Sequence, residues 1–114
     1  MQTVIELNAF KKKAEKLFKT DELTDLINFI AVNPFSGDEI PGTGGVRKLR
    51  FAAKGKGKRS GSRVVYFVFD EVEPIYLLAC YGKSEKGDLS PDEKKAVTAF
   101  AIAAKAIARK KKKK

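Results

Sequence analysis

The sequence of 114 residues contains no histidine, no tryptophan and only one cysteine, Cys80. A single cysteine excludes an intrachain disulfide, and its position in the apolar run from Ile75 to Tyr81 predicts a buried side chain. Without histidine or a cysteine pair, a zinc or iron site would depend on carboxylates alone, so we expect no metal and no cofactor. Serine hydrolase and thiol protease chemistry is also disfavoured, because it needs a positioned base that is usually histidine.

Long apolar runs are absent as well. No run reaches the ~18 residues of a membrane span, and the N-terminus lacks a signal-peptide pattern. An alanine-rich segment before the terminal lysines offers little apolar area for insertion, which makes electrostatic membrane binding the weakest of the possible functions. We therefore expect a cytoplasmic protein without a membrane partner.

Acidic residues are absent from a thirty-residue window, Ile40 to Phe69, that contains eight basic ones. The net charge of the chain is +10, and five of those charges lie in the terminal run from Lys110 to Lys114. The window therefore stays basic without the tail. A fixed positive surface attracts polyanions, because each neutralised phosphate releases condensed counterions. This pattern indicates nucleic acid before any other ligand.

The apolar periodicity predicts an α+β domain with the element order βααβββα. Helical spacing appears between residues 10 and 18 and again from a cap at Thr20 to Asn33, and residues 34–45 are rich in proline and glycine and predict a loop. We expect an antiparallel or mixed four-stranded sheet with an N-terminal helix pair and one C-terminal helix. Residues 1–109 would form a single domain, and residues 110–114 a disordered lysine tail. The predicted strands cover residues 3–7, 46–53, 63–70 and 75–83, and the last helix follows the capping box of Ser90, Pro91 and Glu93.

The basic strand–loop–strand unit is the most informative part of the chain. Lys48 and Arg50 share one face of their strand, and Arg63 begins the next strand. Lys83 ends the following strand and Lys86 lies just beyond it, so a meander could bring these cations to one surface. Tyrosines on the same strands could stack on bases, worth about 1–3 kcal/mol for each base. We predict RNA contacts for Arg47, Arg50, Lys54, Lys56, Lys58, Arg59, Tyr66 and Tyr81.

The order of elements and several motifs resemble the RelE/HigB toxins of bacterial type II toxin–antitoxin pairs, in the HigB-like branch. The resemblance covers nearly the whole chain. It depends on the run from Ile40 to Arg50, the Lys/Gly loop, the segment Arg63 to Tyr66, the segment Tyr81 to Lys86, and the helix start from Leu89 to Lys95. It implies the RelE fold and a ribosome-dependent mRNA endonuclease that cuts in the A site. It also implies neutralisation by a cognate helix-turn-helix antitoxin, through which alone the protein would contact operator DNA.

The resemblance also implies roles for individual residues. Lys48 matches a strand lysine that RelE toxins use at the cleavage site, and Arg63 matches their strand arginine near the scissile phosphate. Lys83 and Lys86 match basic positions after the last strand. The chain departs from RelE at Ser84, where RelE has a catalytic arginine, and the stretch from Gly87 to Ser90 lacks a RelE tyrosine.

For the reaction we expect a ribose 2′-hydroxyl to attack the adjacent phosphate and leave a 2′,3′-cyclic phosphate. Lys48 is the candidate general base, since neighbouring cations favour the neutral amine. Arg63, which is always charged, would hold the phosphate. The alternative function is a non-catalytic basic RNA- or DNA-binding module, or a regulatory partner of an antitoxin.

Overall fold

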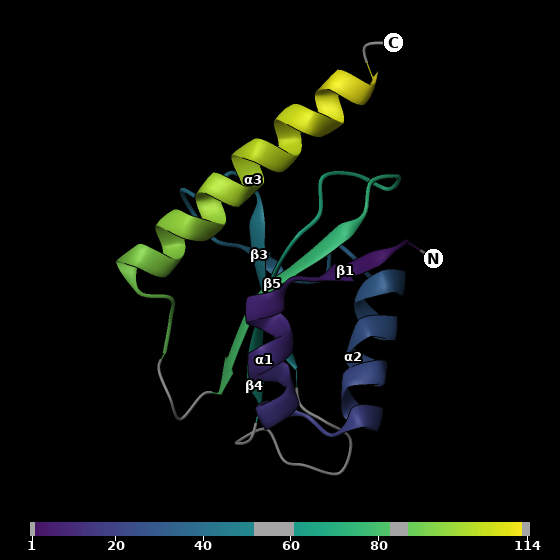
Figure 1. The fold of residues 1–114 in the computed structure, drawn as a ribbon, viewed down its shortest axis with the longest axis vertical. Helices are drawn as coiled ribbons and strands as arrows, with labels where there is room; N and C mark the ends of the chain where they lie inside the picture. Colours follow the sequence, from purple (N-terminus) through teal and green to yellow (C-terminus); the bar gives the residue numbers. More distant parts are fainter. Residues whose placement is uncertain (1, 52–60, 83–86, 113–114) are drawn as a thin grey trace.

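The computed structural model describes residues 2–51, 61–82 and 87–112, and it has one mixed sheet with helices on both faces (Figure 1). Three helices and the expected element order are confirmed, but the described sheet has five strands instead of four. The additional strand, at residues 38–39, lies in the segment that we expected to be only a loop. The strands are β1 (Val4–Glu6), β2 (Asp38–Glu39), β3 (Val46–Phe51), β4 (Ser62–Phe67) and β5 (Ile75–Gly82), and the helices are α1 (Asn8–Leu17), α2 (Thr20–Val32) and α3 (Pro91–Lys112).

The strands lie in the order β1-β5-β4-β3-β2. The pairs β3–β4 and β4–β5 are antiparallel, which confirms the predicted meander, and β1 joins the outer side of β5 in parallel. Strand β2 is antiparallel to β3, with Asp38 in register with Lys48. The central strand is β4, whose residues Val64 to Phe67 are all buried, as the two-faced apolar sequence predicts.

Helices α1 and α2 cover one face of the sheet. Phe10 and Ala14 of α1, and Leu26 and Ile30 of α2, pack with Val64 and other residues of β4 and β5. The predicted cap at Thr20 is wrong by one residue: Thr20 is the first helical residue, and Lys19 precedes the helix. The backbone N–H of Lys19 donates to Oε1 of Glu22 at 2.8 Å, so the glutamate side chain satisfies this end of the helix.

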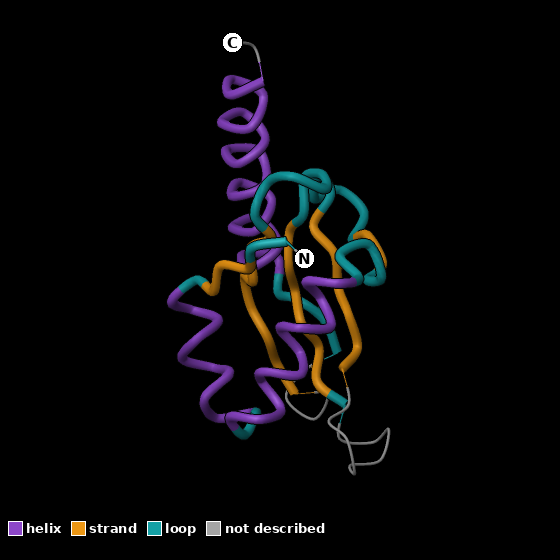
Figure 2. The backbone as a smooth tube through the Cα atoms, turned by 90° about the vertical axis from the view of Figure 1, so that its right-hand side faces the viewer, coloured by secondary structure: helices purple, strands orange, loops and turns teal. Residues whose placement is uncertain are grey.

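Helix α3 packs against the other face, where Val97 and Ala101 contact the cluster of Val46, Val65 and Phe67. Its predicted capping box is confirmed. The N–H of Glu93 donates to Oγ of Ser90 at 3.2 Å, and the N–H of Ser90 donates to Oε1 of Glu93 at 2.8 Å. The helix continues through Lys112, so residues 110–112 of the predicted disordered tail are helical, and it extends beyond the end of the sheet (Figure 2). None of the helices in the described part of the chain is long and apolar enough to span a membrane.

A β-bulge in β5 decides which side chains face α3. Val65 pairs with Ala79 and Tyr66 pairs with Leu77, so Leu78 is an extra residue in β5. Leu77 and Cys80 consequently belong to the cluster under α1 and α2, whereas Tyr81 belongs to the cluster under α3. Strict alternation would have placed Leu77 and Tyr81 on the same face. The bulge therefore places Tyr81 on the face that also carries Lys48, Arg50 and Arg63.

Candidate nucleic-acid interface

Two arginines face each other across β3 and β4. Arg50 is in register with Arg63, and Arg63 is in register with Tyr81 of β5. Directly opposed side chains in antiparallel strands have Cβ atoms about 4.5–5.5 Å apart, and like charges in this arrangement destabilise a sheet. Lys48, two residues before Arg50, projects from the same face. We call Lys48, Arg50 and Arg63 the basic cluster. The arrangement concentrates positive charge at one end of the sheet, and concentrated positive charge attracts anions.

The guanidinium of Arg63 is partly buried, and its Nη1 atom is fully shielded from solvent. Within the described part of the chain, this Nη1 has no hydrogen-bond partner. A buried donor without a partner costs about 1–3 kcal/mol, so its presence points to a specific cause such as strain, a catalytic role, or a bound water or ion. Phosphate oxygens match the paired donors of a guanidinium in geometry and charge. Arg63 is therefore the strongest candidate in the cluster for direct phosphate contact.

Tyr81 supports the basic cluster from below and does not offer a stacking surface. Only 1% of its surface is exposed, so the expected stacking of Tyr81 on a base is inconsistent with this structure. Burial raises the pKa of the Tyr81 phenol above its usual 10.0; Asp88 raises it further, Arg63 lowers it, and Glu93 raises it. The phenol therefore stays protonated at neutral pH. Its ring belongs to the apolar cluster under α3, and its hydroxyl lies within the influence of Asp88, Arg63 and Glu93.

An acidic residue completes this end of the sheet. Nζ of Lys48 lies 3.5 Å from Oδ1 of Asp88, and the same oxygen accepts the backbone N–H of Leu89 at 2.8 Å. The hydrogen bond from Leu89 is the main reason that the pKa of Asp88 is lowered from 3.8, and the charge of Lys48 adds to it. Asp88 is thus ionised at neutral pH. Its contact with Nζ of Lys48 brings a carboxylate and an ammonium together at the basic cluster.

Two residues that we expected at the RNA surface have structural roles instead. Arg47 donates from Nη1 to the carbonyl oxygen of Gly37 at 2.6 Å, contacts Glu39 at 3.3 Å, and lies over the Phe35 ring at 5.2 Å. Its side chain is 18% exposed, so it fixes the segment before β3 and leaves little surface for a phosphate. Tyr66 is fully buried, and its hydroxyl accepts the N–H of Gly37 at 2.9 Å. The complete burial of Tyr66 is inconsistent with its predicted stacking on a base, whereas the RNA contact predicted for Arg47 stays a prediction.

The remaining predicted site residues lie outside the described part of the chain. In the sequence they follow β3 or β5. Phe51 at the end of β3 pairs with Ser62 at the start of β4, and Ser62 pairs with Gly82 at the end of β5, so these three strand ends lie beside the basic cluster. Their roles stay predictions. They are Lys54, Lys56, Lys58, Arg59, Lys83 and Lys86.

Asp88 and Glu93 are the site residues that the sequence did not reveal. Asp88 stood out there only as part of a stretch that lacks a RelE tyrosine, and Glu93 only as a helix cap. The sequence does contain an indication of their position. Both acids follow the last strand, and the end of that strand lies near the basic residues of the neighbouring strands. In a sequence with 24 basic residues, acidic residues so close to the basic strands are candidates for functional groups.

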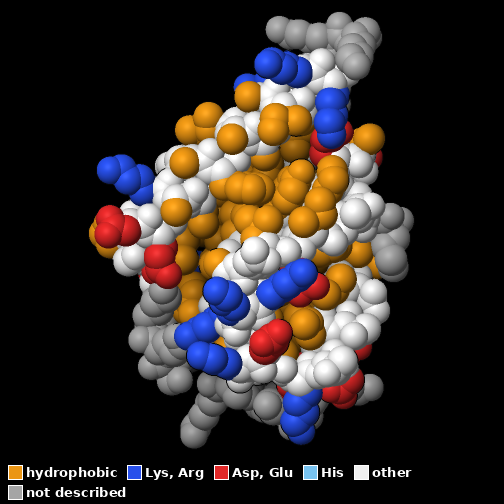
Figure 3. Space-filling view, in the orientation of Figure 1, with side chains coloured by type: hydrophobic (Ala, Val, Ile, Leu, Met, Phe, Trp, Pro, Cys, Tyr) orange, Lys and Arg blue, Asp and Glu red, His pale blue; other side chains and the backbone are white. Residues whose placement is uncertain are grey.

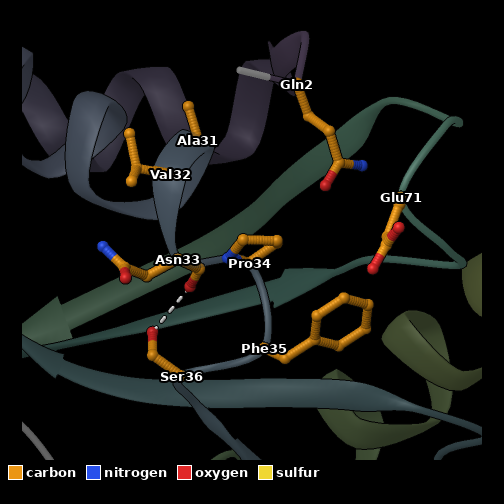
Figure 4. A pocket seen from close by; sticks show the side chains of 8 residues that line it. All are labelled: Gln2, Ala31, Val32, Asn33, Pro34, Phe35, Ser36 and Glu71. Carbon is orange, nitrogen blue, oxygen red and sulfur yellow. Dashed lines mark hydrogen bonds between the residues drawn. The ribbon is translucent and has the colours of Figure 1, made fainter.

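A hollow elsewhere in the described structure does not suit an anion. It encloses about 690 Å³ between the end of α2 and the turn that leads into β5 (Figure 4). Glu71 is its one charged side chain, and Oγ of Ser36 donates to the carbonyl oxygen of Asn33 at 2.8 Å on its wall. Because Glu71 follows β4 whereas Arg63 begins it, the hollow and the basic cluster lie at opposite ends of the strands. Among the described residues, no group of three or more Cys, Asp or Glu could hold a metal ion.

Comparisons with known proteins identify the family and the fold of this chain. The family model described as "RelE toxin of RelE / RelB toxin-antitoxin system" matches residues 3–114. Among solved structures, the E. coli toxin RelE in the free state, with two arginines replaced by alanine, is similar in fold. The TM-score is 0.56 with 16% sequence identity, and the match covers 90% of this chain and 96% of the other. At this identity the second comparison supports the fold, and the first establishes the family.

Proposed function

The chain belongs to the RelE toxin family of the RelE/RelB toxin–antitoxin system, and on that premise we propose that it is an endoribonuclease that cuts mRNA on the ribosome. The observation that carries this proposal is the buried Nη1 of Arg63, without a partner in the described structure, opposite Arg50 and beside Lys48. Such a donor in a basic cluster fits the scissile phosphate of an RNA. We further propose that the cut occurs in the A site and that the protein acts in the cytoplasm.

Arg63 would bind the phosphate and stabilise the negative charge that develops on it. During attack by the ribose 2′-hydroxyl, the phosphorus becomes five-coordinate and its non-bridging oxygens gain charge. A guanidinium fixed by a central strand needs no reorganisation at that moment, which makes this stabilisation effective. Arg50, directly opposite, adds positive potential and could contact the next phosphate. The products would be a 2′,3′-cyclic phosphate and a free 5′-hydroxyl.

Lys48 and Asp88 would divide the proton transfers between them. Because Asp88 offers a second proton-transfer group beside Lys48, we propose that Lys48 donates a proton to the leaving 5′-oxygen instead of acting as the base that the sequence suggested. Asp88, ionised at neutral pH, is the described carboxylate that could accept the proton of the 2′-hydroxyl. The 3.5 Å between Nζ of Lys48 and Oδ1 of Asp88 places both groups at the basic cluster.

The partners follow from the same proposal. A cognate helix-turn-helix antitoxin would neutralise the protein, and contact with operator DNA would come only through that antitoxin. The HigB-like branch within the family stays a prediction. The test is induced expression without the antitoxin, followed by mapping of mRNA 5′ ends. We expect growth arrest and cuts within translated regions. Normal growth with confirmed soluble protein would favour a non-catalytic RNA-binding module.

A further inference from the structure

Lys105 is the single charged residue in an otherwise almost apolar stretch of α3, residues 96–108. It lies four positions after Ala101 and three positions before Ala108, so the three side chains share one side of the helix. Both alanines are buried, and Lys105 is half-buried between them. Figure 3 shows mainly hydrophobic side chains along the middle of α3, with basic ones toward its ends. A lysine on the packed side of a helix normally has a partner for its charge.

The ammonium group of Lys105 lies against the glycine loop, which we define as residues 42–45. A Cβ atom added to Gly44 would be only 3.1 Å from Nζ of Lys105. Gly44 has a φ angle of 77°, which residues with a side chain rarely adopt. Thr43 holds the loop in place, because its Oγ1 donates to the carbonyl oxygen of Ile40 at 2.6 Å. The absence of a side chain at Gly44 therefore leaves room for the lysine head beside a fixed stretch of backbone.

A hollow of about 230 Å³ adjoins this ammonium group, and its charges do not cancel. Arg47 and Glu39 also line the hollow, but they form an ion pair with each other at 3.3 Å. Lys105 forms no hydrogen bond or ion pair with the described residues, so its positive charge has no counter-charge there. The backbone N–H groups of Gly44 and Gly45 likewise donate no hydrogen bond within the described part of the chain. A cation beside unused backbone donors suits an oxyanion such as phosphate.

Lys94 extends this positive charge toward the basic cluster. Its Nζ would be 3.9 Å from a Cβ atom added to Gly42, the first residue of the glycine loop. The charge of Lys94 also reaches Asp88. The hydrogen bond from Leu89 lowers the pKa of Asp88 most, and the charges of Lys48 and Lys94 lower it further. Lys94 is therefore near both the glycine loop and the ion pair of Lys48 with Asp88.

The glycine loop and the basic cluster lie at two ends of one face of the sheet. Val46, Lys48 and Arg50 are alternate residues of β3 and therefore share that face. Val46 directly follows the glycine loop and belongs to the apolar cluster under α3. Arg50 lies about 14 Å further along the strand, at the end that carries Arg63. A single RNA strand bound at the basic cluster could therefore continue along this face to the glycine loop.

We propose that Lys105 and the glycine loop form a second phosphate site, which holds the RNA strand at a phosphate other than the one that is cleaved. The inference rests on the proposed function and adds to it the path of the RNA away from the basic cluster. Lys105 would be the principal contact. Lys94 would contribute less, because Asp92 lines a hollow with it and offsets part of its charge. Contacts of this kind position a strand without reading its sequence.

The test compares the binding of a short and a long RNA without ribosomes. A trinucleotide can occupy the basic cluster alone, whereas a dodecanucleotide can also reach the glycine loop, and 2′-O-methyl groups prevent cleavage of both. Fluorescence anisotropy would compare the unmodified chain with Lys94→Gln/Lys105→Gln. The matched control is Lys11→Gln/Lys12→Gln, which removes two exposed charges from α1 on the other face of the sheet. Circular dichroism confirms folding.

We expect Lys94→Gln/Lys105→Gln to bind the dodecanucleotide about 10-fold more weakly and the trinucleotide with unchanged affinity. The slope of log affinity against log salt for the dodecanucleotide should become shallower by about 0.7 for each lost contact. The α1 variant should bind both RNAs as the unmodified chain does. A dodecanucleotide that binds no more tightly than the trinucleotide, or an equal loss of affinity in the α1 variant, would overturn the proposal.

Isothermal titration with inorganic phosphate distinguishes the source of the phosphate group. Saturable binding of inorganic phosphate that is lost in Lys105→Gln, with the affinity for the dodecanucleotide unchanged, would assign the site to a small anion and overturn the proposal. The RNA measurements do not depend on cleavage, so an inactive endonuclease would still show the dependence on RNA length. A chain that cuts mRNA but binds both RNAs equally would overturn this inference and leave the proposed function intact.

Discussion

Nζ of Lys48 lies 3.5 Å from Oδ1 of Asp88, so the most basic surface of the protein carries its own counter-charge. The two residues come from β3 and from the segment before α3, forty positions apart in the chain. An exposed ion pair of this kind adds little to folding, typically less than about 1 kcal/mol. In the proposed reaction it would place a proton donor and a proton acceptor beside the arginines that would bind the phosphate.

Replacement of Asp88 by asparagine should lower the cleavage rate at saturating ribosome concentration by about 10- to 100-fold, because the proton acceptor is lost while the shape is kept. Binding should be unchanged or slightly tighter, since a negative charge is removed from an anion site. Single-turnover cleavage in a purified translation system measures both quantities. Asp92→Asn is the matched control, because Asp92 is exposed in the first turn of α3. Full activity of Asp88→Asn would exclude Asp88 as the base.

An RNA whose leaving group needs no proton distinguishes two roles of Lys48. If Lys48 donates a proton to the leaving 5′-oxygen, Lys48→Met should lose much of the cleavage rate on ordinary RNA and little on an RNA with sulfur in place of the bridging 5′-oxygen. If Lys48 were the base, Lys48→Met would lose the same fraction of the rate on both RNAs. Single-turnover cleavage of the two RNAs by both proteins measures the difference.

Tyr66→Phe should destabilise the fold without affecting RNA binding. Its hydroxyl accepts the N–H of Gly37 in a buried position, and removal of the hydroxyl leaves that donor unsatisfied. We expect a loss of about 1–3 kcal/mol in the free energy of unfolding, measured by urea denaturation. Tyr76→Phe serves as the control, because Tyr76 is only partly buried and packs edge-on against Phe100 at 5.0 Å. A selective loss of RNA affinity in Tyr66→Phe would restore the stacking role that the sequence suggested.

Tyr81 should make the stability of the protein sensitive to alkaline pH. Its pKa is raised in the folded state from the usual 10.0, mainly by burial, so the folded protein holds this proton more tightly than the unfolded chain does. The resulting stabilisation is fully present below pH 10 and is lost as the pH rises from 10 through the folded pKa. Urea denaturation at several pH values should show a steeper decline above pH 10 for the unmodified chain than for Tyr81→Phe. Parallel declines would show that the phenol does not titrate differently in the two states.

The elements and the basic strands were predictable because they depend on local patterns. Alternation in β3, the two-faced apolar sequence of β4 and the Ser90 capping box all appear within a few residues of sequence. Strand β2 was missed because Asp38 and Glu39 have low strand propensity and pair only through contact with β3. The structural role of Arg47 was missed for the same reason, because its partners Phe35, Gly37 and Glu39 lie 8 to 12 residues earlier in the chain.

The candidate site was only partly predictable for a physical reason. Periodicity places Lys48 and Arg50 on one face, and the meander brings Arg63 beside them. The position of Tyr81 depends on the bulge at Leu78, which has no signature in a run of eight mostly apolar residues. Asp88 reaches Lys48 only because the chain returns across the sheet before α3. Packing of the whole domain determines both the bulge and the path of the chain before α3. The sequence pattern therefore indicates the basic residues of the site but not the acidic residue that pairs with Lys48.

The most direct test of the account is the cleavage rate of Arg63→Ala. Primer extension on an mRNA in a purified translation system measures this rate, with circular dichroism as the folding control and Arg109→Ala as the matched control at the far end of α3. Loss of a preorganised charge-stabilising donor should reduce the rate about 100- to 1,000-fold, and Arg63→Lys should restore little of it because lysine lacks the paired donors. Folding and antitoxin binding should be retained. Cleavage by a folded Arg63→Ala protein at the rate of the unmodified chain would contradict the assignment of the basic cluster as the phosphate site.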